Sequence, residues 1–257
     1  MENDILKLFE RCAEEVQTDL KTLRSRYYGD TMGMGADGTP IKKIDERAEK
    51  TVIENIERET DFNILSEERG LIDRGGDGTV ILDPIDGTSN AVLGIPFYCI
   101  SLAYTEGTLR DTEVGYVKNI IDDTEYRAVS GEGSYMNGHR LDPQSNEEWN
   151  FSVYMGKEAH PESFEVASIP RRVRSLGSAA LEISMVAAGI LDLYFMKTHE
   201  QRRSLRITDL AASFLVLKEA GGEIYDGDLD PLDMELDPKE RKDVAAVNHG
   251  SVLEVLK

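Results

Sequence analysis

The chain has 257 residues, of which 40% are hydrophobic and 30% are charged, and its formal net charge is −20. This length can bury a core without disulfides or a structural metal, and no apolar run reaches the roughly 18 to 20 residues that cross a bilayer. So acidic a chain does not suit nucleic acid, whose phosphates are bound by clustered Lys and Arg. We therefore expect no membrane and no nucleic-acid partner. Because the amino terminus lacks an apolar signal segment, we expect a cytoplasmic location.

The first 141 residues predict helices followed by strands. Apolar residues three and four apart predict a long helix over residues 3–27, and a second such pattern covers residues 45–59. Four glycines and a proline predict a loop over residues 29–40. Short apolar runs predict strands at 62–66, 79–82, 97–104 and 113–117, with a turn at 71–78. A hairpin is expected at 130–141, with Asn137 and Gly138 in its turn.

The second part repeats the alternation of element types. Strands are expected at 151–154, 172–175, 191–195 and 244–247, and helices at 179–188, 208–220 and the end of the chain. Thr208 or the preceding loop is expected to cap the helix that Gly221 and Gly222 end. This order predicts an α/β (α+β) fold layered αβαβα, with mixed sheets between helix layers. We expect a single catalytic unit over 1–257, with subregions of about 1–148 and 149–257.

The densest chemical signal is the segment Ile-Leu-Asp-Pro-Ile-Asp-Gly-Thr-Ser-Asn at residues 81–90. A strand delivers Asp83 at its end, Pro84 forces a turn, and Asp86 returns a second carboxylate close to the first. Two such carboxylates suit Mg²⁺, which takes one or two of them together with waters and phosphate oxygens. Residues 87–89 are expected to open a helix whose N–H groups and positive end seat a phosphate.

Either aspartate alone is more often a turn residue than a metal ligand. Further acids favour the metal site, because Glu67 and Glu68 follow another predicted strand and Asp209 begins a predicted helix, without neutralising bases beside them. We therefore predict a metal site where the fold brings these carboxylates together.

These segments, in this order, resemble the signatures of the inositol monophosphatase family. The resemblance is greatest to its archaeal inositol-1-monophosphatase/fructose-1,6-bisphosphatase type. Six motifs carry it, at residues 38–45, 66–68, 83–88, 131–138, 174–180, and 208–212 with 219–222. The resemblance runs from the first predicted helix to residues 244–248, which is essentially the whole chain.

The resemblance implies an Mg²⁺-dependent phosphatase that hydrolyses a small phosphorylated substrate with metal-activated water. Two or three Mg²⁺ ions are expected, with ligands from Glu67, Asp83, Asp86, Asp209 and the carbonyl of Ile85. The implied catalytic residues are Asp45, Glu67 and Thr88, in which Thr88 is oriented by Asp45 and assists Glu67 in deprotonating the water. The expected substrate contacts are Asp86, Gly87, Thr88, Ser89, Arg174, Ser178, Ala179, Lys197 and Arg202. A homodimer is implied as well.

Two departures from the family pattern concern packing and substrate. Thr208 stands where the family usually has Trp, and Met196 stands where animal inositol phosphatases have a substrate-reading Glu. A cationic stretch over 197–206, including Arg202 and Arg203, can pair with a second phosphate. We therefore expect activity on fructose 1,6-bisphosphate as well as inositol 1-phosphate. The alternative is that these cations lie on a solvated loop or a subunit contact.

Other functions stay open at this point. NADP and 3′-phosphoadenosine 5′-phosphate are alternative substrates within the same family. A haloacid-dehalogenase type phosphatase also carries paired aspartates after a strand, but here two residues separate Asp83 from Asp86 and the motif lies deep in the chain. A catalytically inactive binding module is disfavoured because Asp45, Glu67 and Thr88 are all retained.

Overall fold

The computed structural model describes residues 1–36, 38–143, 148–200 and 204–256. Its helices are α1 (Glu2–Thr22), α2 (Lys43–Glu59), α3 (Thr88–Leu93), α4 (Pro161–Ala167), α5 (Ala179–Ala187), α6 (Ile207–Glu219) and α7 (Gly250–Glu254). Its strands are β1 (Thr31–Met34), β2 (Pro40–Lys42), β3 (Asn63–Ser66), β4 (Gly70–Ile72), β5 (Thr79–Asp86), β6 (Cys99–Thr105), β7 (Thr112–Asn119), β8 (Glu125–Val129), β9 (Gly133–Met136), β10 (His139–Arg140), β11 (Asn150–Val153), β12 (Arg172–Arg174), β13 (Leu193–Met196), β14 (Glu223–Asp226) and β15 (Val244–Val247).

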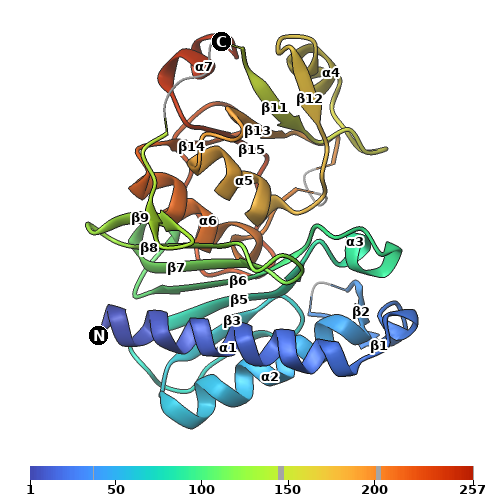
Figure 1. The fold of residues 1–257 in the computed structure, drawn as a ribbon, viewed down its shortest axis with the longest axis vertical. Coiled ribbons are helices and arrows are strands. Elements are labelled where there is room, and N and C mark those ends of the chain that lie inside the picture. Colours follow the sequence, from blue (N-terminus) through green and yellow to red (C-terminus); the bar gives the residue numbers. More distant parts are fainter. Residues whose placement is uncertain (37, 144–147, 201–203, 257) are drawn as a thin grey trace.

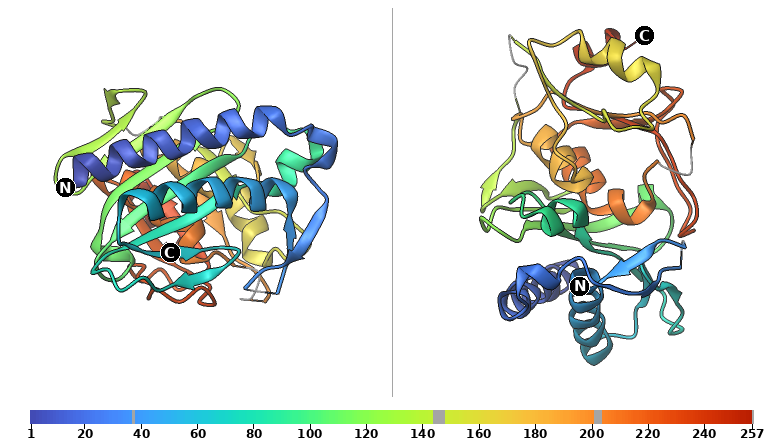
Figure 2. Two further views of the ribbon diagram at one scale, coloured as in Figure 1. Left: turned by 90° about the horizontal axis from the view of Figure 1, so that it is seen from below. Right: turned by 90° about the vertical axis from the view of Figure 1, so that its right-hand side faces the viewer.

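Helices and sheets alternate in five layers (Figure 1). Helices α1 and α2 cover the lower face of a first sheet, α5 and α6 lie between that sheet and a second one, and α4 and α7 lie beyond the second sheet. Figure 2 shows the same layers from two further sides. The predicted layered α/β (α+β) fold is confirmed. No helix of the described residues is both long and apolar enough to span a membrane.

Both large sheets are mixed, and β1 and β2 form a separate antiparallel pair. The first has the strand order β10-β9-β8-β7-β6-β5-β3-β4, in which β3 and β5 are parallel and the other pairs are antiparallel. The second has the order β12-β11-β13-β15-β14, in which β11 is parallel to both of its neighbours and β15 is antiparallel to both of its own. Parallel pairing of β3 with β5 matters for function, because it places the carboxyl ends of both strands at one edge.

Strand β5 lies in the middle of the first sheet and all eight of its residues are buried. Successive side chains of a strand point to opposite faces. Accordingly Val80 and Leu82 pack with α1 and α2, whereas Ile81 packs in the core shared with α5 and α6. That second core continues to Ala246 on β15, so one apolar cluster joins the first sheet, the middle helices and the second sheet.

Several predicted elements are confirmed, with shifted boundaries. The long helix ends at Thr22 and is followed by a short 3-10 turn at Ser25–Tyr27. The hairpin at 130–141 is formed by β9 and β10, and its turn residues Asn137 and Gly138 both have positive φ, as a two-residue hairpin turn requires. Cys12 and Cys99 are buried free thiols.

Other expectations were wrong. Residues 29–40 are not all loop, because β1 pairs with β2 there, and the expected turn at 71–78 begins inside β4. Elements β8, β14 and α4 were not predicted. The N-cap of α6 is Arg206, so of the two expected positions the preceding loop is right, and Thr208 already lies inside the helix.

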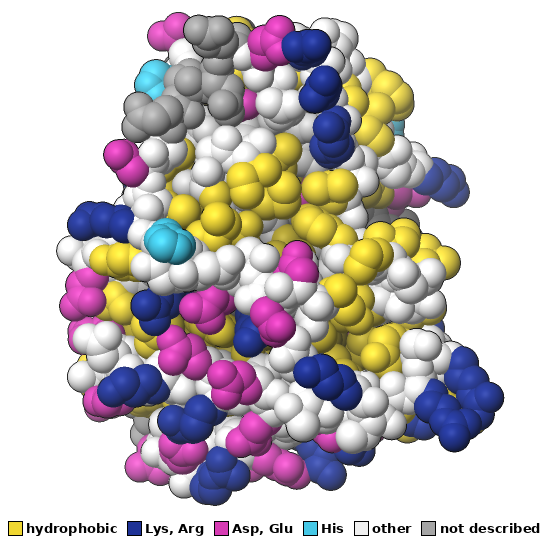
Figure 3. Space-filling model, viewed as in Figure 1, with side chains coloured by type: hydrophobic (Ala, Val, Ile, Leu, Met, Phe, Trp, Pro, Cys, Tyr) yellow, Lys and Arg dark blue, Asp and Glu magenta, His cyan; other side chains and the backbone are white. Residues whose placement is uncertain are grey.

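The surface shows where polar and apolar side chains gather. On the face drawn in Figure 3, acidic and basic side chains are interspersed over the lower part, and hydrophobic side chains gather across the middle. A groove of the molecule is lined by apolar residues from the loop before β6, from β9 and from α5, among them Phe97, Met136 and Met185, with the half-exposed Ile190 beside them.

Candidate active site

Three carboxylates converge where the two halves of the chain meet. Glu67 follows the last residue of β3, Asp83 lies on β5, and Asp209 lies in the first turn of α6. One oxygen atom from each lies within 4.8 Å of the others. The reason is topological: Ser66 pairs with Leu82 in parallel register, so Glu67, just past the end of β3, lies beside Asp83 on β5. Helix α6 packs on that sheet and brings Asp209 to the same place.

A bulge in β5 aims the next carboxylate toward α5. Asp83 pairs with Ser101 on β6 and Asp86 pairs with Cys99, so β5 gains one residue over its neighbour. Pro84 lies within this bulge, where its missing N–H costs no ladder bond. The chain therefore does not leave the sheet at Pro84 as the sequence suggested, because β5 continues to Asp86.

Hydrogen bonds fix the two aspartates of this bulge. The backbone N–H of Ile85 donates to Asp83 Oδ1 at 3.0 Å. Asp86 Oδ2 accepts from Ser178 Oγ and from the backbone N–H of Ala180, each at 2.7 Å. Asp86 is thereby tied to the amino-terminal end of α5, across the boundary between the two sheets.

The hydroxyl of Thr88 lies between two acceptors. Its Oγ1 is 2.8 Å from Asp45 Oδ1 and 2.9 Å from the carbonyl oxygen of Ile85. Asp45 is itself held in the first turn of α2, where its Oδ2 accepts from the backbone N–H of Lys42. The predicted helix after Gly87 is present as α3, and Gly87 has a left-handed φ of 94° that brings Thr88 back over β5.

Burial and like charge raise the pKa of these carboxyl groups. Burial raises the pKa of Asp45 and of Asp86 to about 7, and that of Glu68 to about 8. Burial also raises the pKa of Asp83 well above its ordinary value, and the charges of Glu67 and Asp86 raise it further. Burial therefore penalises the charged form of each of these groups, and a positive charge placed beside them favours it.

This donor set fits a hard divalent cation. The converging ligand atoms are carboxylate oxygens, which Mg²⁺ and Ca²⁺ prefer, and they are packed so closely that their charges oppose one another without a cation. Glu67, Asp83 and Asp209 form the cluster, and Asp86 and the Ile85 carbonyl lie on the adjoining bulge. The acidic cluster that a metal ion needs is therefore present.

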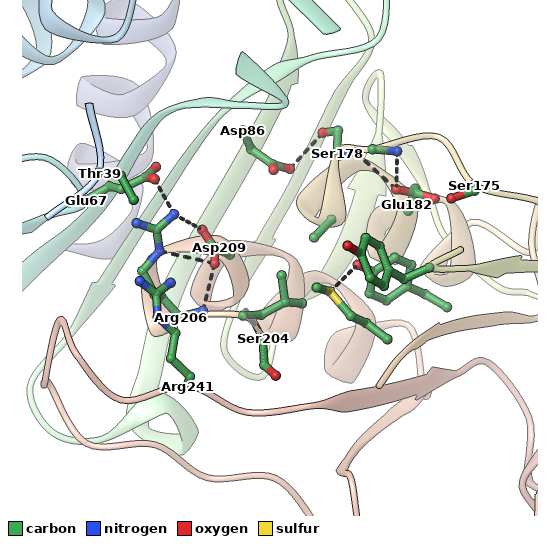
Figure 4. Close-up of a pocket in the computed structure, with 16 residues that line it drawn as sticks. Thr39, Glu67, Asp86, Ser175, Ser178, Glu182, Ser204, Arg206, Asp209 and Arg241 are labelled. Carbon is green, nitrogen blue, oxygen red and sulfur yellow. Dashed lines mark hydrogen bonds and ion pairs between the residues drawn. The ribbon is translucent and has the colours of Figure 1, made fainter. Parts of the chain in front are cut away.

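A cavity of about 360 Å³ opens beside the cluster (Figure 4). Glu67, Arg206 and Asp209 lie on one side of it, and Asp86, Ser178 and Glu182 lie on the other. Its lining residues are Thr39, Glu67, Asp86, Tyr154, Ser175, Gly177, Ser178, Ala179, Glu182, Tyr194, Met196, Ser204, Leu205, Arg206, Asp209 and Arg241.

The predicted substrate contacts divide into two groups. Asp86, Ser178 and Ala179 line this cavity, and residues 87–89 lie at the start of α3. Lys197 instead points its ammonium at Glu162, 2.6 Å away, and at the carbonyl of Gly227. Arg174 is exposed and donates to the carbonyl of Val173. Arg202 and Arg203 lie outside the described residues.

Three charged cavity residues, Glu182, Arg206 and Arg241, were not singled out from the sequence. Arg206 stood only at the end of the cationic stretch 197–206, and Arg241 lies far away in an ordinary charged loop. Glu182 accepts bonds from the backbone N–H groups of Leu176, Gly177 and Ser178 and from the Ser152 hydroxyl. Its signal was available, because it is the one charged residue in the apolar helix α5.

Known proteins share this fold and sequence. The model of the inositol monophosphatase family matches residues 5–256. The fructose-1,6-bisphosphatase/inositol-1-monophosphatase of Archaeoglobus fulgidus is 34% identical over all of this chain and 99% of its own length. A bifunctional NADP phosphatase/NAD kinase of Methanococcus maripaludis is 30% identical over 95% of this chain, which spans 47% of that longer protein.

Solved structures agree. A protein of Pyrococcus horikoshii described as similar to inositol-1 monophosphatase superposes with a TM-score of 0.87, at 27% identity, over 100% of this chain and 98% of its own. An inositol monophosphatase–fructose 1,6-bisphosphatase superposes with a TM-score of 0.85, at 27% identity, over 97% of both chains. The protein is thus a phosphatase, a hydrolase of phosphate esters. More particularly, the chain belongs to the inositol monophosphatase family.

Proposed function

We propose that this phosphatase depends on Mg²⁺ and hydrolyses small sugar and inositol phosphates, including inositol 1-phosphate and fructose 1,6-bisphosphate. The observation that carries the proposal is the convergence of Glu67, Asp83 and Asp209 within 4.8 Å beside a cavity. We propose two or three ions, held by these residues together with Asp86 and the Ile85 carbonyl. When bound, such ions supply positive charge that stabilises the entering and leaving oxygens of an in-line displacement.

In this proposal the chain's own residues orient the water and accept its proton. The Thr88 hydroxyl donates to Asp45 or to the Ile85 carbonyl, so its lone pairs remain to accept a hydrogen bond from water. Burial raises the pKa of Glu67, and a more basic carboxylate is a better acceptor for the proton that the water loses. We assign the phosphate to the start of α3, at residues 87–89, and to Ser178 across the cavity.

The second phosphate of a bisphosphate requires a cation on the cavity wall. Lys197 is engaged with Glu162 and is not among the lining residues, whereas Arg206 and Arg241 are. We therefore propose that Arg241 pairs with the second phosphate, and Arg202 stays a prediction of the sequence. Met196 lies on the same wall and places no carboxylate there to repel that phosphate.

A phosphate-release screen tests the function. The purified protein is assayed with Mg²⁺ on inositol 1-phosphate, fructose 1,6-bisphosphate, NADP⁺ and 3′-phosphoadenosine 5′-phosphate. We expect the first two to be hydrolysed and all release to stop when the metal is chelated. If neither of the first two substrates releases phosphate, the proposal is contradicted.

Two variants test the assignment of the second phosphate. Arg241→Gln should lower kcat/KM on fructose 1,6-bisphosphate about tenfold more than on inositol 1-phosphate, which is the effect of roughly 1.4 kcal/mol in one charged pair. Lys197→Gln is the matched control and should leave the ratio between the substrates unchanged. An unchanged ratio for Arg241→Gln removes this residue from the proposal but not the activity.

NADP⁺ is the second candidate substrate. The relative from Methanococcus maripaludis carries NADP phosphatase in its name and aligns with nearly all of this chain. A screen in which NADP⁺ is preferred over both inositol 1-phosphate and fructose 1,6-bisphosphate selects this alternative.

The homodimer and the cytoplasmic location also remain predictions. The apolar groove beside Met136 and Met185 supports the homodimer, because subunit contacts commonly cover such surfaces.

A further inference from the structure

One guanidinium nitrogen bridges two of the three converging carboxylates. Arg206 Nη2 contacts Glu67 Oε1 and lies 3.3 Å from Asp209 Oδ1 (Figure 4). Arg206 itself is 13% exposed in its side chain, and Glu67 is 17% exposed. Arg206 is therefore a largely buried member of the carboxylate cluster and not a surface residue.

The two oxygens of Asp209 are not equivalent. Oδ2 accepts the backbone N–H of Arg206 at 2.7 Å, which is the bond that closes the first turn of α6. That bond belongs to the helix and persists as long as α6 does. Oδ2 also accepts from the guanidinium Nε of Arg206 at 3.4 Å, whereas Oδ1 lies 3.3 Å from Nη2. Because the backbone bond holds Oδ2, Oδ1 is the oxygen better able to turn to an ion.

The negative charges of the clustered carboxylates require a nearby cation, and the Arg206 guanidinium and a divalent metal ion compete for that position. Buried carboxylates without a partner are costly, and Arg206 offsets part of the charge of Glu67, Asp83 and Asp209. A divalent ion that takes the same oxygens as ligands would lie within a few ångströms of the guanidinium, where like charges repel strongly at low dielectric.

We propose that Arg206 is an exchangeable counter-cation for the metal site: it pairs with Glu67 and Asp209 in the metal-free protein and leaves both when metal binds. Arg206 remains on the cavity wall after this exchange, because it is anchored at the cap of α6. The affinity for the metal then depends on the cost of breaking the Arg206 ion pairs as well as on the ligands. This inference rests on the proposed metal site.

Calorimetric titration with Mg²⁺ alone, without substrate, tests the exchange. Arg206→Gln should bind Mg²⁺ at least tenfold more tightly than the unmodified protein, whereas Arg206→Lys, which keeps the charge, should bind within a few-fold of it. Arg241→Gln removes a charge from the same cavity wall and should change the affinity less than Arg206→Gln. Arg127→Gln removes an ion pair with Glu10 elsewhere and should change nothing.

A second measurement needs no substitution. In the protein labelled with ¹⁵N-arginine, the side-chain resonances of Arg206 should change on Mg²⁺ addition from slow to fast exchange with solvent, while those of Arg127 should not move. Unchanged Arg206 resonances at saturating Mg²⁺, or unchanged or weaker Mg²⁺ binding by Arg206→Gln, overturn the exchange alone. If the unmodified protein binds no Mg²⁺ at all, the proposed metal site falls with it.

Discussion

The two halves of the molecule contribute to the site in different ways. Asp45, Glu67, Asp83 and Thr88 come from one stretch of 44 residues, on elements around the first sheet, and backbone or side-chain hydrogen bonds fix most of them. The second half supplies most of the cavity wall from scattered positions, among them Met196 and Arg241. Apart from Asp209, the residues of the proposed chemistry thus come from one local stretch, whereas the shape that selects a substrate depends on the folding of distant segments.

The first prediction compares a proposed metal ligand of the first half, Asp83, with one of the second half, Asp209, and expects both to be necessary for activity. Asp83→Asn and Asp209→Asn each replace a charged oxygen ligand without changing side-chain volume. Both should lose nearly all Mg²⁺-dependent phosphate release while circular dichroism shows an intact fold. Asp228→Asn, in an exposed turn, is the control and should keep its activity. Near-normal turnover in either cluster variant would show that the site does not span both halves.

The second prediction concerns the chemistry of the first half alone. Thr88→Ala should lower kcat by about 10² to 10⁴-fold, the usual range for assistance by a positioned acid–base group, with much less change in KM. Steady-state kinetics separates the two constants. Thr51→Ala is matched, because Thr51 also donates to a carboxylate, Asp19, but far from the cavity. An effect confined to KM would make Thr88 a binding residue.

The third prediction uses pH on the metal-free protein. Folding raises the pKa of Asp45 and Asp86 to about 7, so the folded state holds protons that the unfolded state releases near pH 4. The contribution of these two groups to the free energy of unfolding is fully present below pH 4 and is lost as the pH rises through 7. Urea unfolding in EDTA should therefore give a free energy of unfolding that falls between pH 5 and 8. Saturating Mg²⁺ should remove most of that fall, and a rise with pH in EDTA would refute the prediction.

The fourth prediction has the smallest effect and concerns the second half. Glu182→Gln should destabilise the protein by about 1 to 3 kcal/mol, the cost of leaving buried donors unpaired, because an amide nitrogen cannot accept the N–H groups of residues 176–178. Chemical denaturation measures the loss. The exposed Glu54→Gln should cost much less, and equal values for the two variants would remove Glu182 as the residue that holds this cavity wall.

Prediction from sequence works best where function depends on local order. Asp83 and Asp86 are recognisable because the residues that shape the bulge, Pro84 and Gly87, stand between and beside them. Even so, the sequence pattern ends the strand too early, since Pro84 indicates a chain break unless the bulge that accommodates it is known.

The cavity wall could not be predicted in the same way. Lys197 and Arg241 carry similar charges, and nothing in their neighbours shows that one turns to Glu162 while the other faces the cavity. That difference is set by how β13 and the loop before β15 meet α6, which is a property of the packed layers.

The hydrogen bonds at the bulge and at the cap of α6 also bear on ion selectivity through ligand denticity. Asp83, Asp86 and Asp209 each have one oxygen that already accepts a backbone N–H. Such carboxylates favour binding an ion through the other oxygen alone. Ca²⁺ commonly takes carboxylates through both oxygens and tolerates seven or eight ligands, whereas Mg²⁺ requires six in a near-octahedral arrangement and keeps several waters. One-oxygen ligands leave room for those waters, so we expect Mg²⁺ to be preferred over Ca²⁺ at this site.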